Sequence, residues 1–150
     1  MSKVNLADYR ALAEFRYEIR KFLAFSESAA RHAGIEPQQH QALLAIKGLP
    51  AGLEPTIGAL AERLCVQHHT AVALVDKLEE RGWAVRKRAT SDRRQVLLSL
   101  TAKGSALLAK LSAMHREQLG AVGSSMVQAL EAIVSAQSLK PQSGKSARRR

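Results

Sequence analysis

Apolar side chains recur at helical spacing near the start of the chain. Within residues 6–33, small or apolar positions stand three or four apart, which predicts one long amphipathic helix. Gly34 follows them and suits the left-handed conformation that often ends a helix. Pro37 then suits the first turn of a second helix. The pattern is carried by Leu12, Phe15, Ile19, Phe22, Ser26, Ala29 and Ala33 in the first helix, and by Leu43, Leu44 and Ile46 in the second.

Two shorter helices follow, with a tight turn between them. Thr56 suits the cap of the third helix, and the pattern breaks at Cys65 and Val66. A fourth helix is predicted from about Gln67 to Arg81, ended by Gly82. This spacing predicts a helix-turn-helix. The apolar faces are Ile57, Leu60, Ala61 and Leu64 in the third helix, and Ala71, Leu74, Val75 and Leu78 in the fourth.

Beyond Gly82 the pattern predicts strands. Residues 83–88 and 95–100 are expected to pair as a β-hairpin with a basic tip at residues 89–94. Thr101 suits the cap of a fifth helix, and Ser124 or Ser125 that of a sixth. The predicted fold class is therefore mainly α with a small β-hairpin wing: a winged helix-turn-helix with additional helices at both ends.

Composition narrows the class of protein further. With 150 residues, of which 46% are apolar, the chain suits one compact unit, expected over residues 1–139. Within it we expect the winged helix at about residues 37–101 and dimerisation helices at about residues 6–33 and 102–138. The sequence shows no apolar run of about 18–20 residues and no secretory signal, so we expect a cytoplasmic protein without membrane contact.

Positive charge is concentrated in two places. The net charge is +10, and basic residues gather between Arg86 and Arg94 and again in residues 140–150. Two such clusters favour a polyanionic partner. The second cluster stands among Pro, Ser and Gly, so we expect a disordered basic tail that adds affinity without specificity.

The helix-turn-helix and the basic hairpin together predict binding to double-stranded DNA. An α-helix fits the major groove, and its first-turn side chains reach base edges. A basic hairpin beside the duplex places arginine in the minor groove, where we expect Asp92 to orient the Arg94 guanidinium. The expected DNA-binding residues are Gln67, His68, His69 and Thr70 in the helix, and Arg86, Asp92, Arg93 and Arg94 in the hairpin.

Residues 56–108 resemble the MarR family of winged-helix regulators. The resemblance is carried by the segments TIGALAERLCVQHHTAVALVDKLEERGWAVRKR and SDRRQVLLSLTAKGSALL. It implies that Gln67 to Thr70 open the recognition helix and that Asp92 and Arg94 form the wing tip. The chain departs from the family pattern in two positions: Gln67 replaces a small hydroxyl cap, and Ala73 replaces a longer polar residue. The recognition helix is therefore expected to make fewer contacts with base edges than is usual in the family.

Apolar residues of the terminal helices predict a homodimer. Phe22, Phe25, Leu119, Val122, Met126, Leu130 and Ile133 exceed what one small core requires. Two-fold dimers suit palindromic operators. The family resemblance also implies a pocket for a small-molecule effector, for which the sequence offers Phe15, Phe22 and His40.

Other classes of function find less support in the sequence. It contains no glycine-rich phosphate loop, H-E-x-x-H, nucleophile elbow or C-x-x-C motif, so we expect neither an enzyme nor a bound cofactor. Cys65 with His68 and His69 supplies too few ligands for a metal site, although a redox- or metal-responsive regulator using Cys65 stays an alternative. A basic winged-helix module that binds a protein or RNA partner is a second alternative.

Overall fold

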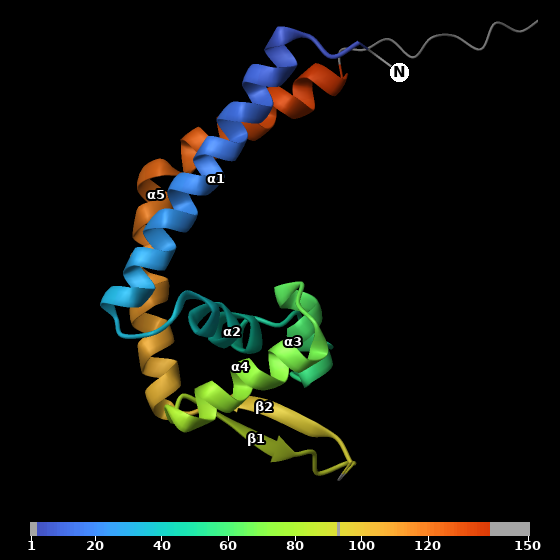
Figure 1. The fold of residues 1–150 in the computed structure, drawn as a ribbon, viewed down its shortest axis with the longest axis vertical. Coiled ribbons are helices and arrows are strands. Elements are labelled where there is room, and N and C mark those ends of the chain that lie inside the picture. The colour runs from blue at the N-terminus through green and yellow to red at the C-terminus, as the bar shows by residue number, and fades with distance from the viewer. Residues whose placement is uncertain (1–2, 93, 139–150) are drawn as a thin grey trace, which may run out of the picture. The chain divides into compact units, whose positions relative to one another are not determined.

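The computed structural model describes residues 3–92 and 94–138, shown as a ribbon in Figure 1. It confirms the predicted fold class, because the elements are helical except for one antiparallel hairpin. In chain order they are α1 (Leu6–His32), α2 (Pro37–Lys47), α3 (Ile57–Leu64), α4 (His68–Glu80), β1 (Ala84–Arg88), β2 (Val96–Leu100) and α5 (Ala102–Ser138).

The chain divides into two compact units. One comprises residues 25–116 and contains the helix-turn-helix and the hairpin. The other is formed by residues 1–24 and 117–150, of which residues 3–24 and 117–138 are described. The prediction of one functional unit over residues 1–139 stays a prediction.

The hydrophobic core of the unit of residues 25–116 includes buried side chains from α2, α3, α4 and the hairpin. The predicted apolar face of α4 is confirmed, since Ala71, Leu74, Val75 and Leu78 are all buried. The hairpin pairs in the register Ala84↔Leu100 to Arg88↔Val96. Other buried side chains in this core are Ile35, Leu43, Leu60, Trp83, Leu98 and Leu111.

Four of the predicted helix ends are confirmed, at Thr56, Thr101, Gly34 and Gly82. The Thr56 hydroxyl accepts a hydrogen bond from the Ala59 amide at 3.1 Å, and Thr101 accepts one from the Gly104 amide at 3.0 Å. Gly34 and Gly82 have φ angles of 81° and 69°, the left-handed conformation that favours glycine. These residues fix where α3 and α5 begin and where α1 and α4 end.

The prediction of a break before Ser124 or Ser125 is wrong. Instead, α5 continues from Ala102 to Ser138 as one helix. Glycine inside a helix costs about 1 kcal/mol relative to alanine but leaves the hydrogen bonds intact, so Gly120 and Gly123 are tolerated. The segment contains no proline to interrupt those bonds. The serines therefore lie within the helix.

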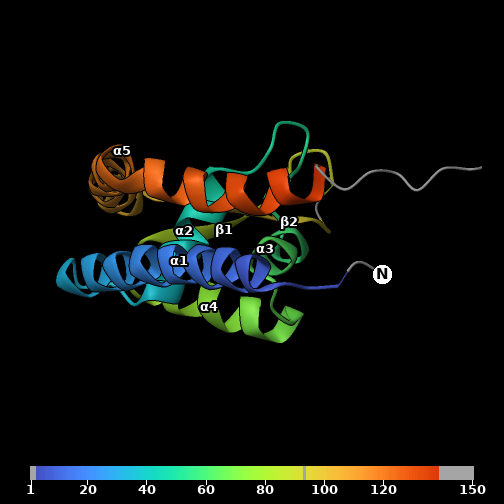
Figure 2. The same ribbon diagram turned by 90° about the horizontal axis from the view of Figure 1, so that it is seen from above.

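In the second unit, the N-terminal part of α1 and the C-terminal part of α5 lie side by side (Figures 1 and 2). An apolar cavity of about 300 Å³ is lined by both, with Val4 and Leu12 from one side and Ile133 from the other. Many large apolar side chains of this unit are exposed. They are Val4, Leu6, Tyr9, Leu12, Tyr17 and Leu23 from the first part of the chain, and Leu119, Val122, Val127, Leu130 and Val134 from α5.

Within the described residues, one helix, α5, is long and apolar enough to cross a membrane by length and composition. Our expectation of no such stretch is wrong for this helix, because Ala, Gly and Ser separate its larger apolar residues without adding charge. Length and composition alone are weak evidence for a span. Only 6% of the apolar window is buried, so its side chains are left for contact with another surface.

Candidate nucleic-acid interface

The first turn of α4 presents polar side chains outward. Gln67 is the extended residue before the helix, and its side chain makes no cap hydrogen bond. Gln67, His68 and His69 are exposed, while Thr70 is half-buried. The opposite face of α4 is buried in the core, so these groups face away from the core of the unit. Three of the four predicted helix residues are thus exposed.

The turn before α4 is held by backbone hydrogen bonds. Cys65 has a φ of 54°, and its amide bonds to the Glu62 carbonyl at 3.1 Å. The next amide, of Val66, bonds to the Ala61 carbonyl at 3.0 Å. The Cys65 thiol is exposed. Among the described residues, no three His, Cys, Asp or Glu side chains lie together as metal ligands would.

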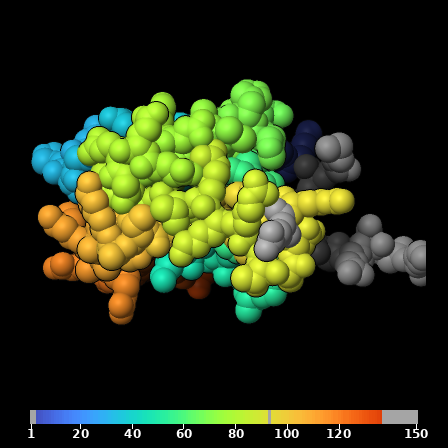
Figure 3. Space-filling model, turned by 90° about the horizontal axis from the view of Figure 1, so that it is seen from below, coloured from blue at the N-terminus to red at the C-terminus, as the bar shows by residue number. Residues whose placement is uncertain are grey.

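The hairpin lies beside α4 on one face of its unit, as Figure 3 shows. Lys87 and Arg88 end β1 and are exposed, and Arg94 is exposed at the tip. Arg93 lies outside the described residues. Lys87 was not among the predicted DNA-binding residues, although it stands in the same basic cluster and is more exposed than Arg86.

Asp92 has a different role from the predicted one. Its carboxylate accepts a hydrogen bond at 2.9 Å from the backbone amide of Arg94, whereas we expected a bond to the guanidinium. A carboxylate two residues before an amide forms an Asx turn readily, because the ring it closes is short. Asp92 therefore shapes the backbone of the tip, and the Arg94 side chain extends into solvent.

Arg86 is engaged within the protein. Its guanidinium donates to Asp76 at 2.7 Å and to Glu79 at 2.6 Å, so β1 is joined to α4. Burial opposes the charged form, but the two carboxylates outweigh it, and the pKa of Arg86 is raised. This geometry supports a bracing role, and a direct DNA contact by Arg86 stays a prediction.

The predicted effector-pocket residues belong to different units. Phe15 and Phe22 lie in residues 1–24, whereas His40 lies in the winged-helix unit and is 2% exposed. The ring centroid of His40 is 5.0 Å from that of His115, which bonds to Ser26 at 2.8 Å. Burial, and then the charge of His115, lower the pKa of His40.

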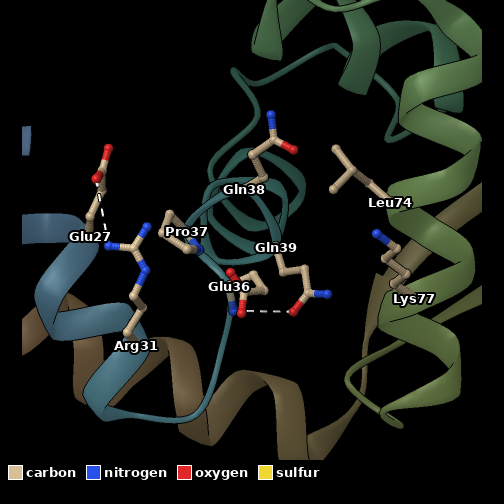
Figure 4. Close-up of a pocket in the computed structure, with 8 residues that line it drawn as sticks. All are labelled: Glu27, Arg31, Glu36, Pro37, Gln38, Gln39, Leu74 and Lys77. Carbon is tan, nitrogen blue, oxygen red and sulfur yellow. Dashed lines mark hydrogen bonds and ion pairs between the residues drawn. The ribbon is translucent and has the colours of Figure 1, made fainter.

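An open cavity of about 530 Å³ lies elsewhere in the winged-helix unit (Figure 4). It is bounded by Glu27 and Arg31 of α1, the start of α2, and Leu74 and Lys77 of α4. None of the predicted pocket residues lines it. Glu36 and Gln39 are used in the capping box of α2, and Glu27 and Arg31 form an ion pair at 3.8 Å. Most of the polar groups that line the cavity therefore serve the local fold.

A helix-turn-helix followed at once by a two-stranded wing defines the winged-helix class. Residues 33–95 match the model of the MarR family. The chain therefore has the winged-helix fold, and its residues 33–95 are similar to the MarR family.

Solved structures show the same fold. A MarR family transcription regulator matches with a TM-score of 0.70 and 19% identity over 87% of each chain. The repressor CouR bound to a 23-mer DNA duplex matches with a TM-score of 0.63 and 26% identity, over 91% of this chain and 99% of that one. CouR from Rhodococcus jostii RHA1 bound to p-coumaroyl-CoA gives 0.61 and 25%, over 79% and 87%. A search of curated proteins found no match.

Proposed function

We propose that this protein is a transcription regulator that binds palindromic operators in double-stranded DNA as a homodimer and is released by a small-molecule effector. The observation that carries the proposal is the common face of the winged-helix unit on which α4, with its polar first turn, and the basic hairpin both lie (Figure 3). The same face of the unit therefore presents a helix that fits the major groove of DNA and an arginine that fits the minor groove.

The similarity to CouR supports the DNA partner and the effector, since that protein has been solved with a DNA duplex and with p-coumaroyl-CoA. The exposed apolar side chains on α1 and α5 support the homodimer. Gln67, His68 and His69 would read base edges, and Lys87 and Arg94 would bind the backbone and the minor groove.

The experiment that tests this proposal begins with selection from a library of random DNA duplexes by the purified protein. Enrichment of a palindromic sequence is expected. Competition with double-stranded RNA then separates the alternatives, because the narrow major groove of RNA excludes side-chain readout. An RNA that competes as well as the selected DNA, or a library that shows no enrichment, would contradict the proposal.

Arg94→Ala tests the wing directly. Because the Arg94 side chain extends from a tip of defined backbone, its removal should cost about 1–3 kcal/mol of operator binding. Arg93→Ala is the neighbouring control and should cost less. Titration at fixed salt measures both affinities, with circular dichroism to verify folding. Unchanged binding by Arg94→Ala, or a larger loss in Arg93→Ala, would refute this assignment of the wing tip.

A further inference from the structure

The loop between α2 and α3 binds the hairpin at two successive residues. The Leu98 amide in β2 donates to the carbonyl of Pro55 at 2.7 Å. The Gln95 side-chain amide donates to the carboxylate of Glu54. Glu54 and Gln95 are 41 positions apart in the sequence. The wing is therefore fastened to the body of its unit at the point where the tip begins.

Gln95 is also the residue that closes the tip. Its carbonyl accepts from the Ala89 amide at 2.9 Å, and its own amide donates to the Asp92 carbonyl at 3.0 Å. Ala89 is 6% exposed, so the base of the tip is packed rather than held out in water. Whatever fixes Gln95 thus fixes both sides of the loop that carries Arg94.

We propose that Glu54 is a positioning residue for DNA recognition: by binding the Gln95 side chain, it sets where the wing tip presents Arg94. This inference rests on the proposed function. Glu54 itself makes no contact with DNA in the proposed complex. It acts through Gln95, whose backbone is covalently joined to Arg94.

A purely electrostatic role and a positioning role for Glu54 predict opposite effects of its removal on DNA binding. A carboxylate close to a polyanion repels it over a distance of about 8–10 Å at moderate salt. If charge alone mattered, removing Glu54 would strengthen binding to every DNA sequence. If Glu54 positions the wing, its removal weakens operator binding despite the lost repulsion. The sign of the effect separates the two.

The test uses the full chain with five variants. Glu54→Ala and Gln95→Ala should each reduce operator affinity by about threefold to tenfold, the usual effect of one lost hydrogen bond, with little loss on random DNA. The double variant should be no weaker than either single one, because both remove the same contact. Glu54→Gln keeps an acceptor for Gln95 and should retain operator affinity. Glu62→Ala removes an exposed acid of α3 and should not weaken binding.

Hydrogen exchange of the Arg94 and Gln95 amides in the absence of DNA provides a second readout. Exchange at both should become several-fold faster in Glu54→Ala but not in Glu62→Ala. If wild-type protein bound no duplex DNA while this difference persisted, the proposed function would fail and the anchoring of the tip would stand.

Equal or tighter operator binding by Glu54→Ala would show that only its charge matters and would overturn the inference. An equal loss on operator and random DNA would overturn it as well, because positioning acts on the specific complex. Thermal unfolding of each variant verifies that the unit is intact.

Discussion

Residues that carry the family resemblance contact one another across the start of α5. The Thr101 hydroxyl donates to the Gly82 carbonyl at 2.6 Å, and Lys103 donates to the Arg81 carbonyl at 3.0 Å. Trp83 is buried beneath the Arg81 guanidinium, which lies 4.4 Å from the centroid of its ring. These contacts give the R-G-W and T-x-K-G segments a shared physical role, which is to join the end of α4 and the wing to α5.

Gly104→Ala should be strongly destabilising. A Cβ at this position would overlap the backbone carbonyl of Trp83, which cannot move aside as a flexible side chain would. We expect a loss of about 1–3 kcal/mol, or failure to fold, because α5 must shift away from Trp83. Gly58→Ala is the matched control, since its Cβ would meet only the Thr56 hydroxyl oxygen at 3.8 Å. Urea unfolding of both variants measures the difference, and equal stability of the two would contradict the steric account.

His40 should make stability depend on pH. Burial and His115 lower its pKa in the folded protein, whereas the unfolded chain has the ordinary value of about 6.5. As the pH falls through about 6.5, the unfolded state therefore binds protons that folded His40 does not, and stability is lost. Above pH 7 this contribution disappears, because His40 is neutral in both states.

Urea unfolding between pH 8 and pH 5 measures this effect. The free energy of unfolding should fall less steeply towards low pH in His40→Phe than in the wild type. His69→Gln changes an exposed histidine of the same unit and should leave the slope unaltered. A slope that persists in His40→Phe would assign the pH dependence to other groups.

At the scale of elements, periodicity predicted most of the fold and missed what depends on contacts distant in sequence. The buried face of α4 and the caps Thr56 and Thr101 follow from local spacing, and the structure confirms them. The predicted break at Ser124 is absent. A serine can cap a helix, but it does not end one where the backbone hydrogen bonds can continue. The bond from Gln95 to Glu54 had no local signal, since its partners meet only in the folded chain.

The same distinction holds for the interface. The exposure of the polar residues Gln67 to His69 could be predicted from the spacing of apolar residues, because the apolar residues that follow them form the buried face of α4. Arg86 was selected for its charge, but its two carboxylate partners lie on another element. Sequence shows which residues are basic, while the structure shows which of them are already paired.

The substitution Arg86→Met distinguishes two roles of Arg86: an ion pair that joins β1 to α4, and a direct contact with a DNA phosphate. Loss of the guanidinium should lower stability by about 0.5–1 kcal/mol, a modest amount because the side chains of Asp76 and Glu79 are partly exposed to solvent, at 55% and 37%. The salt dependence of DNA binding should stay unchanged. Lys87→Met on the same strand should leave stability unaltered and reduce the salt slope by about one. A reduced slope in Arg86→Met would instead support the predicted direct contact.

At the scale of the whole molecule, the exposed apolar side chains of α1 and α5 require a partner surface. We expect that surface to be a second copy of the chain, so sedimentation should give twice the monomer mass at micromolar concentration. Leu130 is 46% exposed, and Leu130→Glu would place a charge in the interface, where an unpaired ion is costly. The dimer should weaken by at least about tenfold, and binding to a palindromic operator should fall with it, because two half-sites are then no longer bound together.

Leu44→Glu is the matched control for this substitution. Leu44 is similarly exposed, at 43%, but lies on α2 in the winged-helix unit, so the charge should leave the dimer intact. An operator cut to one half-site provides the second comparison. If dimerisation acts by joining two recognition units, Leu130→Glu should lose affinity for the full operator and keep it for the half-site. Wild-type protein that sediments as a monomer, or a loss by Leu130→Glu that is equal on both duplexes, would contradict the dimer as the basis of operator binding.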